Sequence, residues 1–390
     1  MSTQNPAIIK IFNIFILLAF LSACSSTPSM KFWGDDEVDP DKPRALNNNA
    51  SFTRNINVKW NKSFAGENIL GNFVPSFSSQ NLYFADSNGN IRSLDSLSGE
   101  IIWEQNIGPL TSGVSSGFGV LVVSDTSGNI ITLNNENGKI LWKKNVKAQV
   151  LSSAAISPKF IIVKTDSGEL IALDKLDGSI SWSYRSKLPT LTIRGSSSPV
   201  IVEDQVFATF DNGRMGVFDI NTGFPLWDGA ISYVSGTSEL ENIIDSDSSP
   251  LIEGGYVYAT NYQGNLNIFD IAQKRSVWQS KSSSFFSPLL IKGLIVLVES
   301  NSHFRSFFAK TLEESWSSDI YHNRQLSNPI SNSGFIIIGD FEGYIHIIDP
   351  VNGKTIGRKK ISKNPIKTLI SRSKNFYAVD ETFNLYALNI

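Results

Sequence analysis

A repeat with a period of about 40 residues constrains the fold of this chain more than any other feature. Seven of the 8 tryptophans recur at this spacing along the chain: Trp60, Trp103, Trp142, Trp182, Trp227, Trp278 and Trp316. Periods in this range are typical of solenoids, propellers and repeat arrays, in which each repeat is one supersecondary unit. The repeat therefore has to be interpreted before domains are counted from the chain length.

Each repeat has the pattern of a small antiparallel sheet. In Leu82–Trp103 (LYFADSNGNIRSLDSLSGEIIW) an apolar strand is followed by an Asn-Gly turn, an alternating strand, a second Gly turn and a short strand that ends near Trp. The pattern recurs at 121–142, 161–182, 206–227 and 257–278, and the run before each unit supplies a fourth strand. The Gly turns suit hairpins because Gly accepts a positive φ without steric cost. No segment has a helical period, so the four-stranded units are predicted to be propeller blades.

The two ends of the repeat region complement each other. The last unit, 376–390, stops at its third strand, whereas Asn55–Trp60 (NINVKW) is a strand with a Trp but no unit before it. Two further units, 295–316 and 335–357, keep the pattern in degraded form, and the second has Gly357 near the Trp position. We therefore expect residues 51–390 to form an all-β, eight-bladed propeller that the N-terminal strand closes by completing the last blade. The repeated Trp is interpreted as a wedge between adjacent blades.

The N-terminus is predicted to be a secretory signal that ends at residue 23. A polar stretch ends at Lys10, and the apolar run that follows (IFNIFILLAF, 11–20) is too short for a membrane-spanning helix. Small residues then precede Cys24, the single cysteine of the chain. This junction resembles a bacterial lipobox, which implies cleavage before Cys24 and lipidation of its thiol. Ser25 is not the Asp that resembles an inner-membrane retention signal, so the outer membrane, on its periplasmic side, is the expected location.

Residues 24–50 are predicted to be a flexible tether behind the lipidated cysteine. They contain several prolines, an acidic run and an Asn triplet, and they have no apolar period. A flexible segment of this length has an r.m.s. reach of roughly 28 Å. The propeller is therefore expected to orient freely near the membrane.

Charge and cysteine content exclude several classes of protein. The 34 basic and 36 acidic side chains leave a formal net charge of −2, so no nucleic-acid partner is expected. One cysteine excludes a disulfide framework and a Cys-based zinc site. The three histidines, His303, His322 and His346, lack metal-ligand spacing and are expected to be exposed or turn residues. Neither a metal nor a cofactor is predicted.

Two catalytic patterns have a structural explanation. Gly113–Gly117 (GVSSG) matches GxSxG, but no helix pattern follows it, and a nucleophile elbow needs a strand-to-helix turn. Five aspartates recur at one position of the repeat and are predicted to form turns rather than paired acids: Asp95, Asp174, Asp219, Asp270 and Asp349. The sequence therefore predicts no catalytic residue.

Two segments break the repeat. Leu188–Gly195 (LPTLTIRG) follows the third unit, and Ser235–Pro250 (SGTSELENIIDSDSSP) lies in the longest gap between tryptophans. Long loops on repeat scaffolds are common binding elements, and an Arg among exposed aliphatic side chains is typical of interface hot spots. Ordinary long loops are the alternative interpretation.

Taken together, these features resemble the BamB family, the propeller lipoproteins of the bacterial outer-membrane β-barrel assembly machinery. The lipobox, the repeats and above all the two irregular segments carry the resemblance. It implies a non-catalytic scaffold that binds BamA through its POTRA domains, joins the rest of the Bam complex, and aids folding and insertion of nascent outer-membrane β-barrel proteins. By position, it implies partner-binding roles for Leu191, Ile193, Arg194, Asp245 and Asp247. Whether the two aspartates contact the partner or hold Arg194 stays open at this point.

Two other functions compete with this one. The repeats also resemble those of pyrroloquinoline-quinone dehydrogenases, but the adjacent cysteines of those enzymes and an evident calcium-binding set are missing here. A lipid-anchored propeller that binds another envelope protein is the second alternative.

Overall fold

The computed structural model describes residues 39, 41–47, 51–64, 66, 71–187, 197–232 and 248–390. The predicted signal at 1–23 and Cys24 lie outside these residues. The chain divides into two units, Met1–Lys42 and Pro43–Ile390, and all strands of the described residues lie in the second. No helix long and apolar enough to cross a bilayer occurs within the described ranges.

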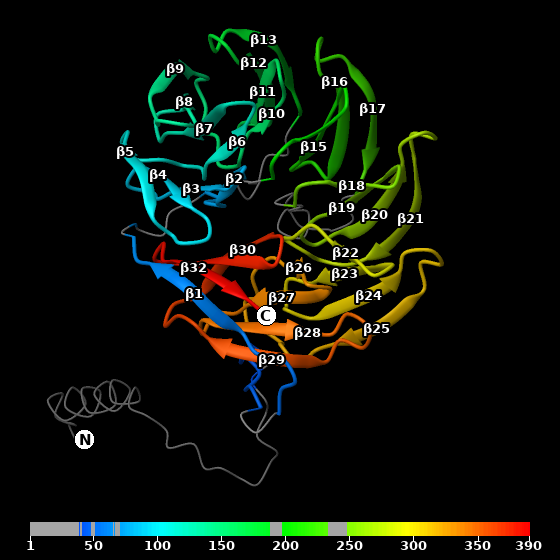
Figure 1. Cartoon of the computed structure of the whole chain (residues 1–390). Helices are drawn as coiled ribbons and strands as arrows, with labels where there is room; N and C mark the ends of the chain where they lie inside the picture. Colours follow the sequence, from blue (N-terminus) through cyan, green and yellow to red (C-terminus); the bar gives the residue numbers. More distant parts are fainter. Residues whose placement is uncertain are drawn as a thin grey trace, which may run out of the picture. The chain divides into compact units, whose positions relative to one another are not determined.

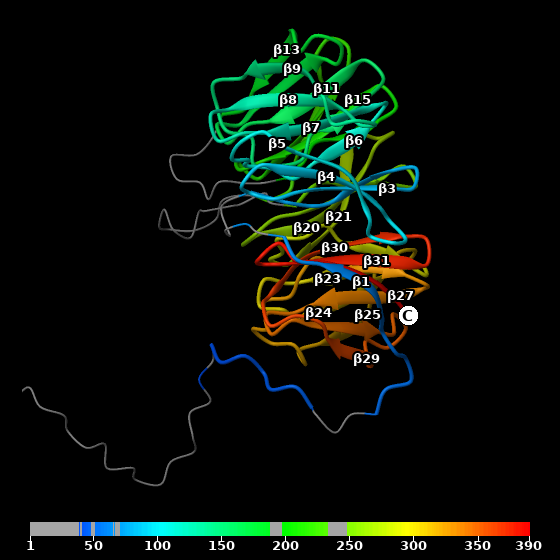
Figure 2. The same cartoon turned by 60° about the vertical axis from the view of Figure 1, so that its left-hand side comes forward.

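Eight separate four-stranded sheets follow one another around a ring in sequence order (Figure 1, Figure 2). Blades 1 and 2 contain β2 (Ser76–Ser78), β3 (Asn81–Ala85), β4 (Asn90–Asp95), β5 (Ile101–Asn106), β6 (Ser115–Gly117), β7 (Val120–Ser124), β8 (Asn129–Asn134) and β9 (Ile140–Asn145). Blades 3 and 4 contain β10 (Ala155–Ile156), β11 (Phe160–Lys164), β12 (Glu169–Asp174), β13 (Ile180–Arg185), β14 (Val200–Val202), β15 (Gln205–Phe210), β16 (Arg214–Asp219) and β17 (Pro225–Ala230).

The later blades repeat this plan, including the two whose sequence pattern is degraded. Blades 5 and 6 contain β18 (Leu251–Glu253), β19 (Tyr256–Thr260), β20 (Asn265–Asp270), β21 (Arg275–Lys281), β22 (Leu289–Ile291), β23 (Leu294–Val298), β24 (Phe304–Phe308) and β25 (Glu314–Ser318). Blades 7 and 8 contain β26 (Ile330–Asn332), β27 (Phe335–Gly339), β28 (Tyr344–Ile348), β29 (Thr355–Lys360), β30 (Ile366–Arg372), β31 (Asn375–Asp380), β32 (Leu385–Asn389) and β1 (Asn57–Lys62). The predicted eight-bladed, all-β propeller is confirmed.

The ring closes where the two ends of the repeat region meet. Strand β1 pairs antiparallel with β32, from Asn57 opposite Asn389 to Lys62 opposite Leu385. In Figure 1 the blue β1 lies beside the red β32. Because β1 is the outer strand of blade 8, the last blade is complete only when the N-terminal strand has joined it, as the sequence predicts.

The core lies between neighbouring blades. The second strand of a blade is covered on both faces, so β7 is buried along its whole length, whereas the outer strand β9 alternates exposed and half-buried residues. Continuous apolar runs such as Val120–Val123 therefore form the middle strands, since a strand buried on both faces needs no polar side. Sequences in which exposed and half-buried residues alternate, such as that of β9, form the outer strands.

The repeated tryptophans lie between adjacent blades. Five of the seven indoles pack on a turn glycine of the next blade and donate the Nε1–H to a carbonyl of the same turn; Trp142, for example, donates to the Lys175 carbonyl at 2.8 Å. A Cβ added at Gly178 would come within 2.5 Å of the Trp142 ring. Because Gly178 also has a φ of +73°, no other residue fits this turn well. The same donor bond is made by Trp60, Trp103, Trp182 and Trp316.

The N-terminal segment occupies the place of the wedge that blade 7 lacks. Gly357 stands where other blades have Trp, and a Cβ there would lie 2.9 Å from the Arg54 carbonyl. The backbone N–H groups of Thr53 and Arg54 both donate to the Ile356 carbonyl at 2.9 Å. Ile56 is 4% exposed and packs in the apolar cluster between blades 7 and 8. A backbone segment and one Ile thus replace a Trp at the point where the chain ends meet.

Residues 43–47, within the expected tether, lie against blades 6 and 7. The Arg44 backbone N–H donates to the His322 carbonyl at 3.0 Å, and its side chain pairs with Asp319 at 2.8 Å. Its own carbonyl accepts a bond from Arg324 at 2.9 Å, and Leu46 packs on the apolar cluster of these blades. This end of the expected tether is thus held by the ring.

Candidate partner-binding site

The residues predicted to bind a partner lie outside the described part of the chain: Leu191, Ile193, Arg194, Asp245 and Asp247. The residues that flank or end the two segments are described, and they are called the segment ends here: Ser186, Lys187, Ser197 and Ser198 around the first, and Ser232, Ser248 and Ser249 for the second. These ends show from which blades the segments start, and how the starting points are placed relative to one another.

The first segment connects blade 3 to blade 4. At its beginning, the Asn212 side-chain amide donates to the Ser186 hydroxyl and to the Lys187 carbonyl, both at 3.1 Å. At its end, Ser197 is 1% exposed, and its hydroxyl donates to the Thr209 carbonyl at 3.4 Å. Lys164 of blade 3 donates to the same Ser197 hydroxyl. Both ends are thus held by buried or half-buried polar contacts.

The second segment connects blade 4 to blade 5. Ser232, where the described part stops, donates from its hydroxyl to Asn261 Oδ1 at 2.8 Å. Ser248, where it resumes, is 2% exposed and accepts bonds from two threonines. The Thr209 hydroxyl donates to the Ser248 carbonyl at 3.0 Å, and the Thr260 hydroxyl donates to the Ser248 hydroxyl at 2.8 Å.

The C-terminal ends of the two segments touch each other. Both have the sequence Ser-Ser-Pro directly before the inner strand of a blade, and the Ser198 N–H donates to the Ser249 hydroxyl at 2.8 Å. Ser248 and Ser249 also line a cavity of about 250 Å³ with the inner ends of blades 6, 7 and 8. The two segments therefore return to the ring at one place beside its centre.

An aromatic opening of about 350 Å³ lies next to this place. Its wall includes Phe285, Phe286 and Lys367, and Phe285 stacks on Tyr262 with ring centroids 4.7 Å apart. Glu299 lies on the same wall, and burial raises the pKa of its carboxyl above the ordinary value in spite of nearby Arg305. Such a surface suits contact with a polypeptide better than with a small charged substrate.

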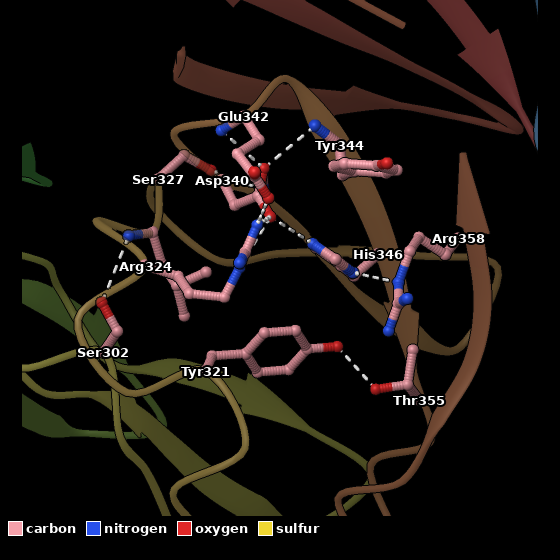
Figure 3. A network of polar contacts seen from close by, with 12 residues as sticks. Ser302, Tyr321, Arg324, Ser327, Asp340, Glu342, Tyr344, His346, Thr355 and Arg358 are labelled. Carbon is pink, nitrogen blue, oxygen red and sulfur yellow. Dashed lines mark hydrogen bonds and ion pairs between the residues drawn. The ribbon is translucent and has the colours of Figure 1, made fainter. Parts of the chain in front are cut away.

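A polar cluster lies in blade 7 and on the connection that leads to it from blade 6 (Figure 3). Asp340 and His346 are fully buried, and Nε2 of the His lies 3.0 Å from an Asp oxygen. Arg324 binds the same carboxylate at 2.7 Å, and Arg358 donates to Nδ1 of His346 at 3.3 Å. Because Nδ1 accepts while Nε2 donates, the ring is the neutral tautomer. The cluster ties the connection from blade 6 to blade 7.

The pKa values of this cluster follow from its burial and its partners. Burial lowers the pKa of His346 below its ordinary value, against the opposing effect of Asp340. Burial alone would raise the pKa of Asp340, but the hydrogen bonds of His346 and Arg324 hold it below its ordinary value. The expectation that the three histidines are exposed or turn residues is therefore wrong for His346, which lies inside β28.

The other two histidines contact each other. His303 Nε2 and His322 Nδ1 lie 2.8 Å apart in half-buried turns, although the residues are far apart in sequence. Burial and the neighbouring His322 lower the pKa of His303 below its ordinary value. Among the residues that the structure describes, no group of three or more His, Cys, Asp or Glu side chains is arranged to hold a metal ion.

The two catalytic patterns are structural, as predicted. Ser115–Gly117 is strand β6, and β7 follows it directly, so the GxSxG match is not a strand-to-helix turn. The repeated aspartates accept backbone N–H bonds within their own turns: Asp95 from Leu97 and Ser98, Asp174 from Leu176, Asp219 from Asn221 and Thr222, Asp270 from Gln273, and Asp349 from Val351.

Sequence reasoning missed the residues that hold the segment ends. Lys164 ends an otherwise apolar strand (FIIVK) but is only 4% exposed. A Lys at the position where other blades have Ala85 or Ser124 was the available signal. Thr209 and Thr260 occupy this position in blades 4 and 5, and nothing in a strand sequence distinguishes a Thr that supports a loop from one that only packs.

Comparison with known proteins identifies consistent relatives. The family model described as outer membrane protein assembly factor BamB matches residues 87–318. The BamB of Pseudomonas aeruginosa is 34% identical over 80% of this chain and 83% of its own length. The BamB of Kangiella koreensis is 32% identical over 90% of this chain and 88% of its own length.

Solved structures agree on the fold. The crystal structure of BamB from Moraxella catarrhalis has a TM-score of 0.77 and 24% identity, covering 85% of this chain and 100% of that one. The quinohemoprotein alcohol dehydrogenase of Comamonas testosteroni has a TM-score of 0.67 at 10% identity, covering 86% of this chain and 76% of the enzyme. At these identities a likeness shows the fold alone.

Proposed function

This chain belongs to the BamB family of outer membrane protein assembly factors, and we propose that it is a non-catalytic scaffold that binds BamA within the Bam complex. In this role it aids folding and insertion of β-barrel proteins into the outer membrane. The observation that carries the proposal is the meeting of the two irregular segments, at the Ser198–Ser249 contact, beside an aromatic opening.

The chemistry of the segments suits a protein partner. Leu191 and Ile193 bury apolar surface on a POTRA domain of BamA, and Arg194 pairs with its carboxylates or carbonyls. Asp245 and Asp247 bind the partner or orient Arg194. Because the segment ends are fixed side by side, one partner surface can engage both segments at once.

The anchor raises the effective concentration of the partner. Acyl chains on Cys24 place the propeller on the periplasmic side of the outer membrane, where BamA is embedded. Two proteins held at one membrane need only a modest intrinsic affinity to remain associated.

Exposed outer strands support a second contact, with nascent barrel strands. The first residues of the outer strands of blades 1 to 3 are apolar and exposed: Ile101, Ile102, Ile140, Leu141 and Ile180. These strands end their sheets, so their free backbone groups can add an extended segment by β-augmentation. Ile102→Lys and Leu141→Lys should reduce capture of an unfolded outer-membrane porin by the purified protein.

Co-purification with BamA tests the main proposal. Arg194→Glu in the full-length lipoprotein should abolish recovery of BamA from detergent-solubilised outer membrane. Arg275→Glu, at an exposed site on the outer strand of blade 5, is the matched control and should leave recovery unchanged. Wild-type recovery with Arg194→Glu would refute the named surface. Quinone-dependent oxidation by the calcium-loaded protein would instead support the dehydrogenase alternative.

A further inference from the structure

Positive charge is concentrated in blade 7 and at the beginning of blade 8. Residues 343–374 contain 8 of the 34 basic residues of the chain but only 1 of its 36 acidic residues, Asp349. This stretch therefore carries a formal charge of +7, whereas the rest of the chain carries −9. An asymmetry of this size indicates a surface that meets a partner of negative charge.

Four exposed lysines follow the outer strand of blade 7, β29, from just before its start to just after its end (Figure 1). We call them the basic edge: Lys354, Lys359, Lys360 and Lys363. Within the part of the chain that the structure describes, none of the four makes an ion pair. Carboxylates of blades 7 and 8 are bound elsewhere. Asp340 and Glu342 bind Arg324, and Glu381 pairs with Lys367 at 2.9 Å.

The N-terminal segment enters the ring beside the basic edge. Arg358 of β29 donates to the Asn47 carbonyl at 3.0 Å, and its guanidinium lies 5.2 Å from the centre of the Phe52 ring. Lys359 Nζ donates to the Ile56 carbonyl at 2.9 Å. The chain that leads from the predicted anchor thus runs along the same outer strand that carries the lysines.

The predicted anchor is also close to this edge along the chain. Cys24 lies 20 residues before Arg44, which contacts blades 6 and 7. A flexible segment of that length has an r.m.s. reach of roughly 25 Å. A basic patch beside an acyl chain forms a stronger membrane attachment than the chain alone. The position of the basic edge therefore favours a lipid surface as its partner.

We propose that the basic edge binds the anionic phospholipid headgroups of the membrane that holds the acyl chains of Cys24. This inference rests on the proposed function, because it assumes that Cys24 is lipidated. Lysine suits such a partner, since its ammonium group is a compact charge on a flexible stem and can follow mobile headgroups. Protein interfaces, by contrast, are depleted in Lys and enriched in Arg. Blade 7 then faces the bilayer, and blade 3, on the opposite side of the ring, is turned away from it (Figure 1).

Blade 2 also has a basic outer strand, but its surroundings differ. Lys143 of β9 pairs with Asp125 at 2.9 Å, and the N-terminal segment enters the ring at blades 6 to 8. The likeness of the two strands provides internal controls. Lys139 and Lys354 both follow an Asn-Gly turn, directly precede an outer strand and are exposed.

The test compares Lys354 with Lys139 in one molecule. The full-length lipoprotein is added to preformed vesicles of phosphatidylcholine, or of phosphatidylcholine and phosphatidylglycerol in equal parts. Flotation with the neutral vesicles checks the anchor. The rate at which a bilayer-impermeant amine-reactive ester labels each lysine is then measured by mass spectrometry.

We expect the anionic vesicles to slow the labelling of Lys354 by about fivefold relative to the neutral vesicles, the factor by which one basic residue improves binding near such a surface. Labelling of Lys139 should not change. At about 1 M salt the Debye length falls to about 3 Å, and the protection of Lys354 should be lost.

Two double variants test the charge itself. Lys360→Glu with Lys363→Glu should remove the protection of Lys354. Lys144→Glu with Lys147→Glu makes the same change in charge at the same spacing on blade 2, and it should leave the protection intact. Equal effects of the two double variants would overturn the inference, because net charge rather than this edge would then decide the contact.

The remaining outcomes separate the inference from the function on which it rests. Equal labelling of Lys354 in neutral and anionic vesicles, with normal flotation, would overturn the basic edge and leave the anchor intact. Protection that appears only after purified BamA is added would identify a protein partner in place of lipid. Failure to float with neutral vesicles would overturn the anchor, and the inference with it, whereas binding of BamA is tested separately by Arg194→Glu.

Discussion

Trp182 offers a direct measure of what a blade wedge contributes to stability. This side chain is 8% exposed between blades 3 and 4, and its Nε1–H donates to the Ile220 carbonyl at 2.8 Å. Its ring covers Gly223 so closely that an added Cβ would lie 2.5 Å from it. Trp182→Ala would open a cavity between two blades and leave a buried carbonyl without its donor.

The magnitude follows from the buried area. A Trp buries about 150–250 Å² of surface, and at about 25 cal/mol per Å² this amounts to roughly 4–6 kcal/mol as an upper bound. Measured Trp-to-Ala substitutions in cores cost about 3–5 kcal/mol, so we expect about 4 kcal/mol. For roughly 340 folded residues the entropy of unfolding is about 0.7 kcal/mol per kelvin, so the melting temperature should fall by about 6 °C.

Calorimetry and urea unfolding of the purified protein give both quantities. Trp182→Phe keeps much of the ring but loses the N–H donor, and should cost about half as much. Trp33→Ala, in the predicted tether outside the described residues, makes the same chemical change and should leave the melting temperature unchanged. A fall of less than about 2 °C for Trp182→Ala, with an unchanged urea slope, would refute the wedge argument.

Three further substitutions test other parts of the ring. Gly178→Ala should destabilise the fold by more than Gly254→Ala does, because both have a positive φ (+73° and +61°) but only Gly178 meets a Trp ring; equal melting temperatures would contradict this. Asp340→Asn removes a charged partner of the buried Arg324 and should cost about 3 kcal/mol in urea unfolding, and a cost below about 1 kcal/mol would show that the pair is not coupled. Because burial lowers the pKa of His346, the unfolded chain binds a proton that the folded chain excludes. The free energy of unfolding should therefore fall as the pH drops below about 6.5, by at most about 1.4 kcal/mol per pH unit. His346→Asn should flatten this slope between about pH 7.5 and 5.

The repeat by itself determined the architecture of this protein. Strand alternation and Gly turns are local signals, and they act within a few residues, so each blade could be predicted from its own sequence. Even the closure was predictable, because a blade without an outer strand and a strand without a blade have only one way to pair. The two irregular segments were recognisable for the complementary reason that they depart from the period.

Only the tertiary structure decided which polar residues became buried and what they join. His346 lies in β28, and its burial depends on Asp340, in the turn before this strand, and on Arg324, which comes from the connection between blades 6 and 7 and binds Asp340. Likewise, Lys164 and Thr209 are in contact because blades 3 and 4 are adjacent. The sequence of one strand does not show which residues of the neighbouring blade it contacts. Contacts within a blade depend on neighbouring turns, so the fold followed from the sequence. Contacts between blades depend on the closed ring as a whole, so the residues that support the two irregular segments did not follow from it.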